Sequence, residues 1–447
     1  MKTKLLVQGE TGCQCKPKLF RKLWCVSVLA LAMALPVSAF CQTTWAGGGT
    51  QNSPGSWLNG TWSPSGPPSA SSNVTIGSGY VTLDTISTAT VSSLTLDNNG
   101  TLFAQPAAYN IGSNSLTVTN TLTVGDASSG QLSLVTNGYC DNAPGSCYPV
   151  NPLYTPVTNT LTSGSGVIGN SLGSTGYVSI GGNGEVWTIN SGNLEVGNAG
   201  AGLLTLGGGA TVNVTNGSIC VGCSGGSGTV VVTGGGSLGS ASSSINIGVN
   251  GTGNVTVSNG GVLSSGTGPT PAGTIMIGTG GIVTADGGTL EGAVVNNGSL
   301  DPSTAITIEG SYAQGPGGIL TFDVLSAGQY GSIDVTGNPA TVTLDSGSTI
   351  DIDFLNGYTP PNGYQTTFNF FTGASGGITN DATVLFTGLP LGDTFGVNLT
   401  NGKFELTINP GDPVPESGTW VLLLTALIAM AAFAGCRKRS ILPNLVI

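Results

Sequence analysis

One short pattern, apolar-x-apolar-Gly, recurs through the middle of the chain. Each copy is followed by a turn rich in Gly, Ser and Asn, and then by a second stretch in which apolar and polar residues alternate. The clearest copies begin at residues 194, 219, 245 and 275, and weaker copies end at Gly125 and Gly169. The marker glycines at 169, 197, 222, 248 and 278 are 28, 25, 26 and 30 residues apart. An insertion lengthens the interval from 125 to 169 to 44 residues. Repeats of this size indicate stacked supersecondary units.

The alternation within each copy has the period of a β-strand, so Leu194 and Val196 should face a core while Glu195 faces water. Two or three short strands cannot bury an apolar face alone, whereas stacking one repeat on the next makes a continuous core. A glycine after each strand permits the positive φ of a coil corner. The sequence therefore predicts an all-β fold, a parallel β-helix (solenoid) with β-rich caps. A sandwich of β-hairpins is the alternative.

Charge is scarce and one-sided, since only 7% of the 447 residues are charged and histidine is absent. Between residues 23 and 436 there are 20 Asp or Glu and one basic residue, Lys403, which gives a net charge of −19. A body this acidic repels phosphate backbones, so nucleic-acid binding is excluded. Divalent cations, cationic proteins and neutral glycans are the partners that such a surface tolerates.

The first 41 residues predict an export signal, with a signal helix. A basic segment precedes an apolar stretch at 23–35, and the small residues Val37, Ser38 and Ala39 follow it. This order is typical of a secretory signal peptide, cleaved after Ala39 or after Cys41.

The other end predicts a membrane anchor. Residues 420–436 form a 17-residue stretch without charge, at the short end of the ~17–25 residues that span a bilayer as a helix. Trp420 marks the outer interface, and Arg437, Lys438 and Arg439 mark the cytoplasmic one. A buried core helix is the alternative, but no amphipathic helix is predicted elsewhere for it to pack against. We expect insertion in the inner membrane.

A Pro-Glu dipeptide stands just before this segment, at Val414, Pro415 and Glu416. Together with the apolar helix and the basic cluster it resembles the PEP-CTERM sorting signal of Gram-negative, exopolysaccharide-producing bacteria. The resemblance implies recognition by an exosortase-type processing enzyme and release outward. The motif departs from the family at Ser417, where a second proline is usual.

The repeats also resemble a known class. Residues 248–261 (GVNGTGNVTVSNGG) are similar to the repeat shared by autotransporter passengers and PEP-CTERM proteins. That resemblance implies a right-handed β-helix, surface display or adhesion, and no catalytic residues. The expected organisation is a signal peptide at 1–41, a β lead-in at 42–114, β-helix repeats at 115–300 with an insertion at 137–160, a β cap region at 301–409, a linker at 410–419, a transmembrane helix at 420–436 and a basic cytoplasmic tail at 437–447.

Two close cysteine pairs lie in the exported body, Cys140 with Cys147 and Cys220 with Cys223. Outside the cytoplasm such pairs are most often disulfides that staple loops. Free thiols are the main alternative. A metal or redox role is disfavoured, because no histidine can assist a zinc site and no helix N-terminus or positive charge activates a thiol.

The only metal candidates are Asp351 and Asp353, which alternate on one face of a predicted strand. Two carboxylates there could share a calcium ion. A solvated strand face is the more common reason for such a pair. No other metal and no cofactor is predicted.

The composition argues against an enzyme. Ser-His-Asp and Cys-His chemistry are impossible without histidine. Paired carboxylates could still hydrolyse a glycoside, and the formal candidates are Glu185, Glu195, Glu291 and Glu309.

We therefore predict an exported cell-surface structural or adhesin-like protein, sorted by an exosortase and associated with exopolysaccharide or a biofilm matrix. The alternative is a carbohydrate-binding module with a groove around Trp57, Trp62 and Trp187. A carboxylate-dependent glycoside hydrolase is the third hypothesis.

Overall fold

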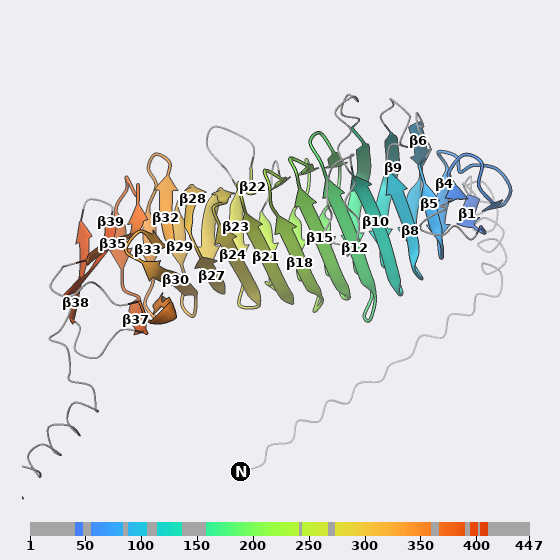
Figure 1. The fold of residues 1–447 in the computed structure, drawn as a ribbon. Helices are drawn as coiled ribbons and strands as arrows, with labels where there is room; N and C mark the ends of the chain where they lie inside the picture. Colours follow the sequence, from blue (N-terminus) through green and yellow to red (C-terminus); the bar gives the residue numbers. More distant parts are fainter. Residues whose placement is uncertain are drawn as a thin grey trace, which may run out of the picture. The chain divides into compact units, whose positions relative to one another are not determined.

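The described part of the protein is almost entirely β-structure in its computed structural model (Figure 1). The chain divides into two compact units, Met1–Cys41 and Gln42–Ile447. Among the described residues there are 39 strands, in two sheets of 25 and 14 members, and one 3-10 turn, η1 (Leu355–Gly357). The all-β prediction is confirmed. The structure describes residues 41–47, 55–83, 88–104, 114–135, 158–240, 244–266, 273–358, 366–388, 394–400 and 403–409.

The 14-stranded sheet takes one strand from each turn of the chain. Its members are β2 (Gly55–Ser56), β5 (Tyr80–Thr82), β8 (Gly100–Ala104), β10 (Ser129–Val135), β12 (Thr175–Gly181), β15 (Ala201–Gly207), β18 (Ser227–Val232), β21 (Thr252–Ser258), β24 (Gly281–Asp286), β27 (Ser299–Pro302), β30 (Ile319–Ser326), β31 (Gln329–Tyr330), β34 (Thr349–Phe354) and β37 (Thr383–Thr387).

The 25-stranded sheet contains two stacks of strands. One stack comprises β6 (Thr88–Val91), β9 (Ser115–Val124), β11 (Thr160–Ile168), β13 (Val186–Ile189), β16 (Thr211–Val214), β19 (Ser237–Ser240), β22 (Val262–Ser265), β25 (Thr289–Glu291), β28 (Ala305–Glu309), β32 (Ser332–Thr336), β35 (Thr366–Thr372), β39 (Lys403–Asn409) and β38 (Thr394–Thr400).

The second stack shares the long strands β9 and β11 with the first. Its other members are β1 (Cys41–Trp45), β3 (Trp62–Ser63), β4 (Ser72–Ile76), β7 (Ser93–Leu96), β14 (Leu194–Val196), β17 (Ile219–Val221), β20 (Ile245–Ile247), β23 (Thr274–Ile277), β26 (Ala293–Asn296), β29 (Tyr312–Gln314), β33 (Val342–Leu344) and β36 (Ile378–Asn380).

Each sequence repeat supplies three strands: one to the 14-stranded sheet and one to each of the two stacks of the 25-stranded sheet. The chain runs through β15, β16 and β17 and then begins the next turn at β18, directly beside β15. The predicted period of two is confirmed in β14, where Leu194 and Val196 are fully buried and Glu195 is only half-buried.

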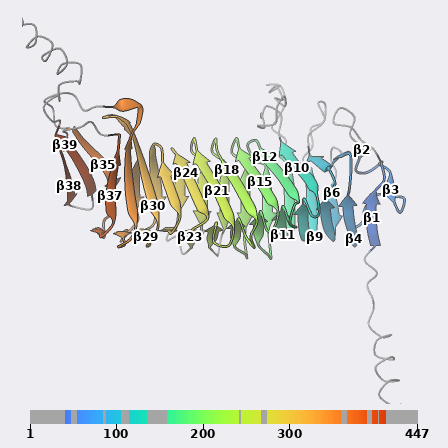
Figure 2. The same ribbon diagram turned by 90° about the horizontal axis from the view of Figure 1, so that it is seen from below.

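Neighbouring turns pair in parallel and in register. Leu194 stands beside Ile219, Ile219 beside Ile245, and Ile245 beside Ile275. All pairs between 160 and 290 are parallel, and the colour gradient in Figure 2 shows consecutive turns lying side by side. These long parallel sheets are consistent with a β-helix, and they rule out the hairpin sandwich for this region.

Parallel stacking extends past both predicted limits of the repeats, 115 and 300. It begins with β2 beside β5 and β4 beside β7, and it continues to β34 beside β37. The insertion predicted at 137–160 is shorter at its C-terminal side, because Thr160 already begins β11. Antiparallel pairs among the described strands join β1 to β3, β30 to β31, and β39 to both β35 and β38.

The core changes character along the stack. Its middle is filled by Val, Leu and Ile side chains, each of which contributes roughly 1.5–3 kcal/mol when it is fully buried. Aromatic rings gather toward the ends. Trp62 lies edge-on to Trp45 and Trp57, with ring centroids 4.9 and 5.2 Å apart, and Phe322 stacks on Phe370 at 4.7 Å.

The marker glycines form the corners. Gly169, Gly197 and Gly222 have φ of +70°, and Gly248 has +61°, as predicted, while Gly278 does not have a positive φ. A Cβ atom built on Gly197 would lie 2.2 Å from the carbonyl of Ser227 in the next turn. The corner glycine thus meets two demands, a left-handed backbone and contact with the neighbouring turn.

Several predictions fall outside the described residues. They are the signal peptide, the sorting motif at 414–416, the apolar segment 420–436 and the basic tail. Within the described part of the chain, no helix is long and apolar enough to cross a membrane.

We expect Gly197→Ala to destabilise the protein more than Gly225→Ala. Both glycines have a positive φ, but a Cβ on Gly225 meets nothing within 4 Å. Gly225→Ala should therefore cost only the left-handed backbone term of about 1–2 kcal/mol. Gly197→Ala should cost about 1–3 kcal/mol more for overpacking against Ser227. Urea unfolding of both variants measures the difference, and equal midpoints would contradict the role given to the corner glycine.

Candidate functional site

A column of buried polar side chains runs through one corner of three successive turns. Asn114, Asn159 and Glu185 each precede the first residue of a strand, and each is at most 1% exposed. Asn114 Nδ2 donates to Asn159 Oδ1 (3.1 Å), and Asn159 Nδ2 donates to Glu185 Oε1 (3.0 Å). The backbone N–H of Asn159 donates to Glu185 Oε2 (3.1 Å). The donors all point toward the carboxyl group, which ends the column.

The pKa of the Glu185 carboxyl differs strongly from its ordinary value. Burial raises its pKa from 4.5 to about 8, although the two hydrogen bonds from Asn159 favour the ionised form. A perturbed carboxyl is often a functional group, but here the side chain is fully enclosed, so no sugar can reach it. Glu185, one of the formal hydrolase candidates, is therefore a core residue.

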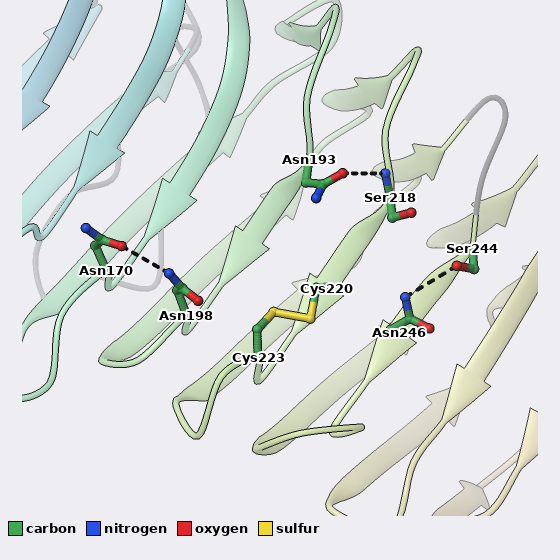
Figure 3. Close-up of a disulfide and its surroundings, with 8 residues drawn as sticks. All are labelled: Asn170, Asn193, Asn198, Ser218, Cys220, Cys223, Ser244 and Asn246. Atoms are coloured by element: carbon green, nitrogen blue, oxygen red, sulfur yellow. Dashed lines mark hydrogen bonds between the residues drawn. A yellow bond between two sulfur atoms is a disulfide. The ribbon is translucent and has the colours of Figure 1, made fainter. Parts of the chain in front are cut away.

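A second polar ladder runs along the corner that follows the marker glycines. Asn170 Nδ2 donates to Asp126 Oδ1 (2.7 Å), and Asn198 Nδ2 donates to Asn170 Oδ1 (3.1 Å), as Figure 3 shows for the latter pair. Each of these residues directly follows a marker glycine. A further corner repeats the device, since Ser218 N–H donates to Asn193 Oδ1 (3.0 Å).

The next position after Asn198 in this ladder is Cys223, which forms a disulfide with Cys220 (S–S 2.06 Å). The bond joins the outward side chain of β17 to the corner that follows it, and its sulfur atoms are not available as metal ligands. The other predicted pair, Cys140 with Cys147, lies outside the described residues.

The calcium candidates Asp351 and Asp353 alternate on the outer face of β34, as the sequence predicts. Asp353 stands beside Asp323 of β30. Burial and then the charge of Asp353 raise the pKa of Asp323, and burial and then the charge of Asp323 raise the pKa of Asp301 to about 6. Within the described ranges, no three acidic or cysteine side chains gather closely enough to hold a metal ion.

The remaining hydrolase candidates lie on outer faces of the 25-stranded sheet. Glu291 stands beside Glu309 on neighbouring strands, and Glu195 is alone on β14, where burial raises its pKa. Of the four glutamates proposed for a hydrolase, only Glu291 and Glu309 are placed side by side by the pairing of the strands.

The tryptophans predicted to line a glycan-binding groove are instead core residues. Trp57, Trp62 and Trp187 are 1%, 4% and 0% exposed. Trp187 Nε1–H donates to Ser163 Oγ (2.9 Å), and Trp62 Nε1–H donates to the backbone oxygen of Trp57 (3.0 Å). Because the polar end of each ring is satisfied internally, neither needs water, and the groove prediction is wrong for these residues.

The outer faces of the sheets are therefore the candidate functional surface. Sequence reasoning missed both polar ladders, although a signal was present. Asp or Asn follows the marker glycines at 125, 169 and 197, and Asn or Glu precedes the strands that begin at residues 115, 160 and 186. It also missed how hydroxyl side chains align across turns, because the alignment depends on the length of each turn.

In comparisons with known proteins, the chain matches no family model and no curated protein.

We expect Glu185→Gln to change the pH dependence of stability. Because the folded state holds the Glu185 proton more tightly than the unfolded chain does, the stabilisation is complete below about pH 4.5 and is lost as pH rises toward about 8. Glutamine cannot ionise, but its amide nitrogen replaces one of the two oxygens that accept from Asn159, so the variant should be less stable than wild type at acidic pH. The free energy of unfolding of the variant minus that of wild type should then rise over this range, by up to a few kcal/mol.

Urea unfolding at several pH values measures this difference. Glu309→Gln is the matched control, since Glu309 is exposed and should show a difference of less than about 0.5 kcal/mol at every pH. Curves for wild type and Glu185→Gln that stay parallel from pH 5 to about 8 would contradict a buried, protonated Glu185.

Proposed function

We propose that this chain is an exported structural or adhesin-like protein of the cell surface, built as a right-handed parallel β-helix. It is sorted by an exosortase-type processing enzyme acting near Val414, Pro415 and Glu416, and it is associated with exopolysaccharide or a biofilm matrix. The observation that carries this proposal is the unbroken parallel stack of strands, with an apolar interior and an outer surface of uncharged polar residues.

The right-handed winding is supported by a general rule. About 98% of connections between parallel strands of one sheet are right-handed, because twisted strands pack back onto their sheet only in that way. Each turn here returns to a parallel neighbour, for example β15 to β18 and β18 to β21.

A long scaffold suits a role outside the cell. The main path of the 14-stranded sheet contains thirteen strands. Twelve steps of ~4.8 Å give a stack of roughly 60 Å. Such a body presents a large area with few charges, so many weak contacts to neutral polymers can add together.

The residue types also support a non-enzymatic role. The chain has no histidine, and Lys403 is the single basic residue between the two ends. Acid–base and nucleophilic chemistry would depend on carboxylates alone. Nucleic acid remains an unsuitable partner for the acidic body.

Intact-mass analysis of the native protein tests the sorting proposal. Export and processing should remove the signal peptide and the segment from 420 onward, so that the mature chain ends near Glu416. A mass equal to residues 42–447 would show that the tail is retained, and it would overturn release by an exosortase. The same spectrum, before and after reduction, reports the disulfides.

A glycan array on the purified protein tests the adhesive role. The scaffold proposal expects weak, broad binding to neutral polymers. Tight binding to one glycan class would instead favour a carbohydrate-binding module, with a site other than the buried tryptophans.

A further inference from the structure

One outer face of the 25-stranded sheet carries an aligned array of hydroxyl groups. It lies on β6, the first half of β9, the first half of β11, β13 and β16. Each strand contributes two outward residues, separated by one buried residue. We call this array the threonine face, and it consists of Thr88, Thr90, Ser115, Thr117, Thr160, Thr162, Val186, Thr188, Thr211 and Asn213.

The five rows are parallel and in register without a shift. Thr90, Thr117, Thr162 and Thr188 stand side by side in one column, and Asn213 follows them. Rows are ~4.8 Å apart, and the two columns are ~6.7 Å apart along each strand. Seven of the ten residues are threonine, and Val186 has the shape of threonine with a methyl group in place of the hydroxyl.

These side chains are not used by the fold. Among the described residues, none of the nine polar side chains of the threonine face is hydrogen-bonded to another protein group, although all are at least partly exposed. The neighbouring stack differs, since Ser93 Oγ donates to Asn73 Oδ1 (2.8 Å) and Ser165 Oγ donates to Thr121 Oγ1 (2.9 Å). The threonine face thus keeps its donors and acceptors for a partner.

Strand propensity alone does not explain the array. Threonine is common on exposed strands of any kind. The 14-stranded sheet winds through the same turns, yet one of its outward columns contains Tyr80, Thr101, Gln131, Tyr177 and Leu203. The second outward column of that sheet, with Ser133, Ser179, Thr205, Val231 and Thr256, is itself rich in hydroxyl groups. Only one of the two outward columns there has this chemistry, whereas both columns of the threonine face have it.

The chemistry of the threonine face restricts its partner. It carries no charge within a body whose net charge is −19 between residues 23 and 436, so the complementary partner is itself neutral. It has no aromatic ring on which a sugar could stack. Its side chains are small and similar, and they stand on a regular grid. Affinity must therefore come from many equal contacts, which requires a partner that repeats on a matching grid.

We propose that the threonine face binds the surface of crystalline ice. Water is neutral, donates and accepts hydrogen bonds equally, and in ice repeats on a fixed lattice of similar dimensions. Hydroxyl groups at regular positions hold bridging waters, and the γ-methyl groups between them confine those waters in ranks. Ordered water of this kind can join a growing ice crystal. The inference depends on the register of β6 to β16 and not on export, sorting or glycan binding.

The test uses the purified full-length chain and polycrystalline ice. We expect the wild-type protein to partition into slowly growing ice and to slow its recrystallisation. Thr162→Tyr places a large ring in the central row and breaks the flat grid, so it should lower the partition into ice by at least about tenfold, because the summed contacts are lost together. Thr188→Tyr, in the next row, should act in the same way.

Leu203→Tyr is the matched control, because Leu203 occupies an outward position of β15 on the other sheet, beside Tyr177 and away from any hydroxyl column shared with the threonine face. It should bind ice like wild type, with the same circular dichroism and unfolding midpoint as the other two variants. Exclusion of the wild-type chain from ice, or equal binding by Thr162→Tyr and Leu203→Tyr, would overturn the proposal. So would binding to microcrystalline cellulose or chitin in place of ice, with loss in Thr162→Tyr, which would assign the face to a crystalline glycan.

Discussion

Close parallel stacking of the backbone is the constraint on which the rest of this protein depends. At Gly125, Gly169, Gly197, Gly222 and Gly248 the chain turns with a positive φ against the backbone of the next turn. A side chain there would separate the turns and break the hydrogen bonds that join consecutive strands. The low charge follows from the same constraint, because outward residues repeat every turn and like charges at ~4.8 Å would repel. Asp301 on β27 and Asp323 on β30 show part of that cost, because burial and, second, a neighbouring carboxylate raise their pKa values.

Stacking of similar turns also creates ladders, in which side chains from the same position of consecutive repeats contact one another. A residue type that recurs at one position of the repeat meets its own copy in the next turn. Asn170 and Asn198 bond to each other outside the core, and Asn114 and Asn159 do so within it. An interior ladder is safe only if its ends are satisfied. Glu185 accepts the last donors of the buried ladder, whereas Asn114 Oδ1 has no partner among the described residues.

The sequence predicted those features that depend on the repeat and missed those that depend on register. Period two in Leu194–Val196 and the corner glycines needed only local rules. The groove prediction for Trp187 is wrong, because Ser163, 24 residues earlier, accepts a hydrogen bond from its N–H inside the core. Glu185 was considered as a surface carboxylate because its position before a strand does not reveal that Asn159 lies above it. Gly278 lacks a positive φ, although the pattern around it is intact.

Register decides function here as well as fold. A glycan-binding or catalytic protein gathers different side chains at one point, and this requires irregular loops that bring distant residues together. A stack in register does the opposite, because it repeats one chemistry over a large area. Where insertions are absent, as between β11 and β16, the outward residues remain aligned from turn to turn. A surface of this kind recognises periodicity and not shape. For this reason both proposals assign it partners that are extended and repetitive, polymer or lattice, with an affinity that depends on how many rows stay in register.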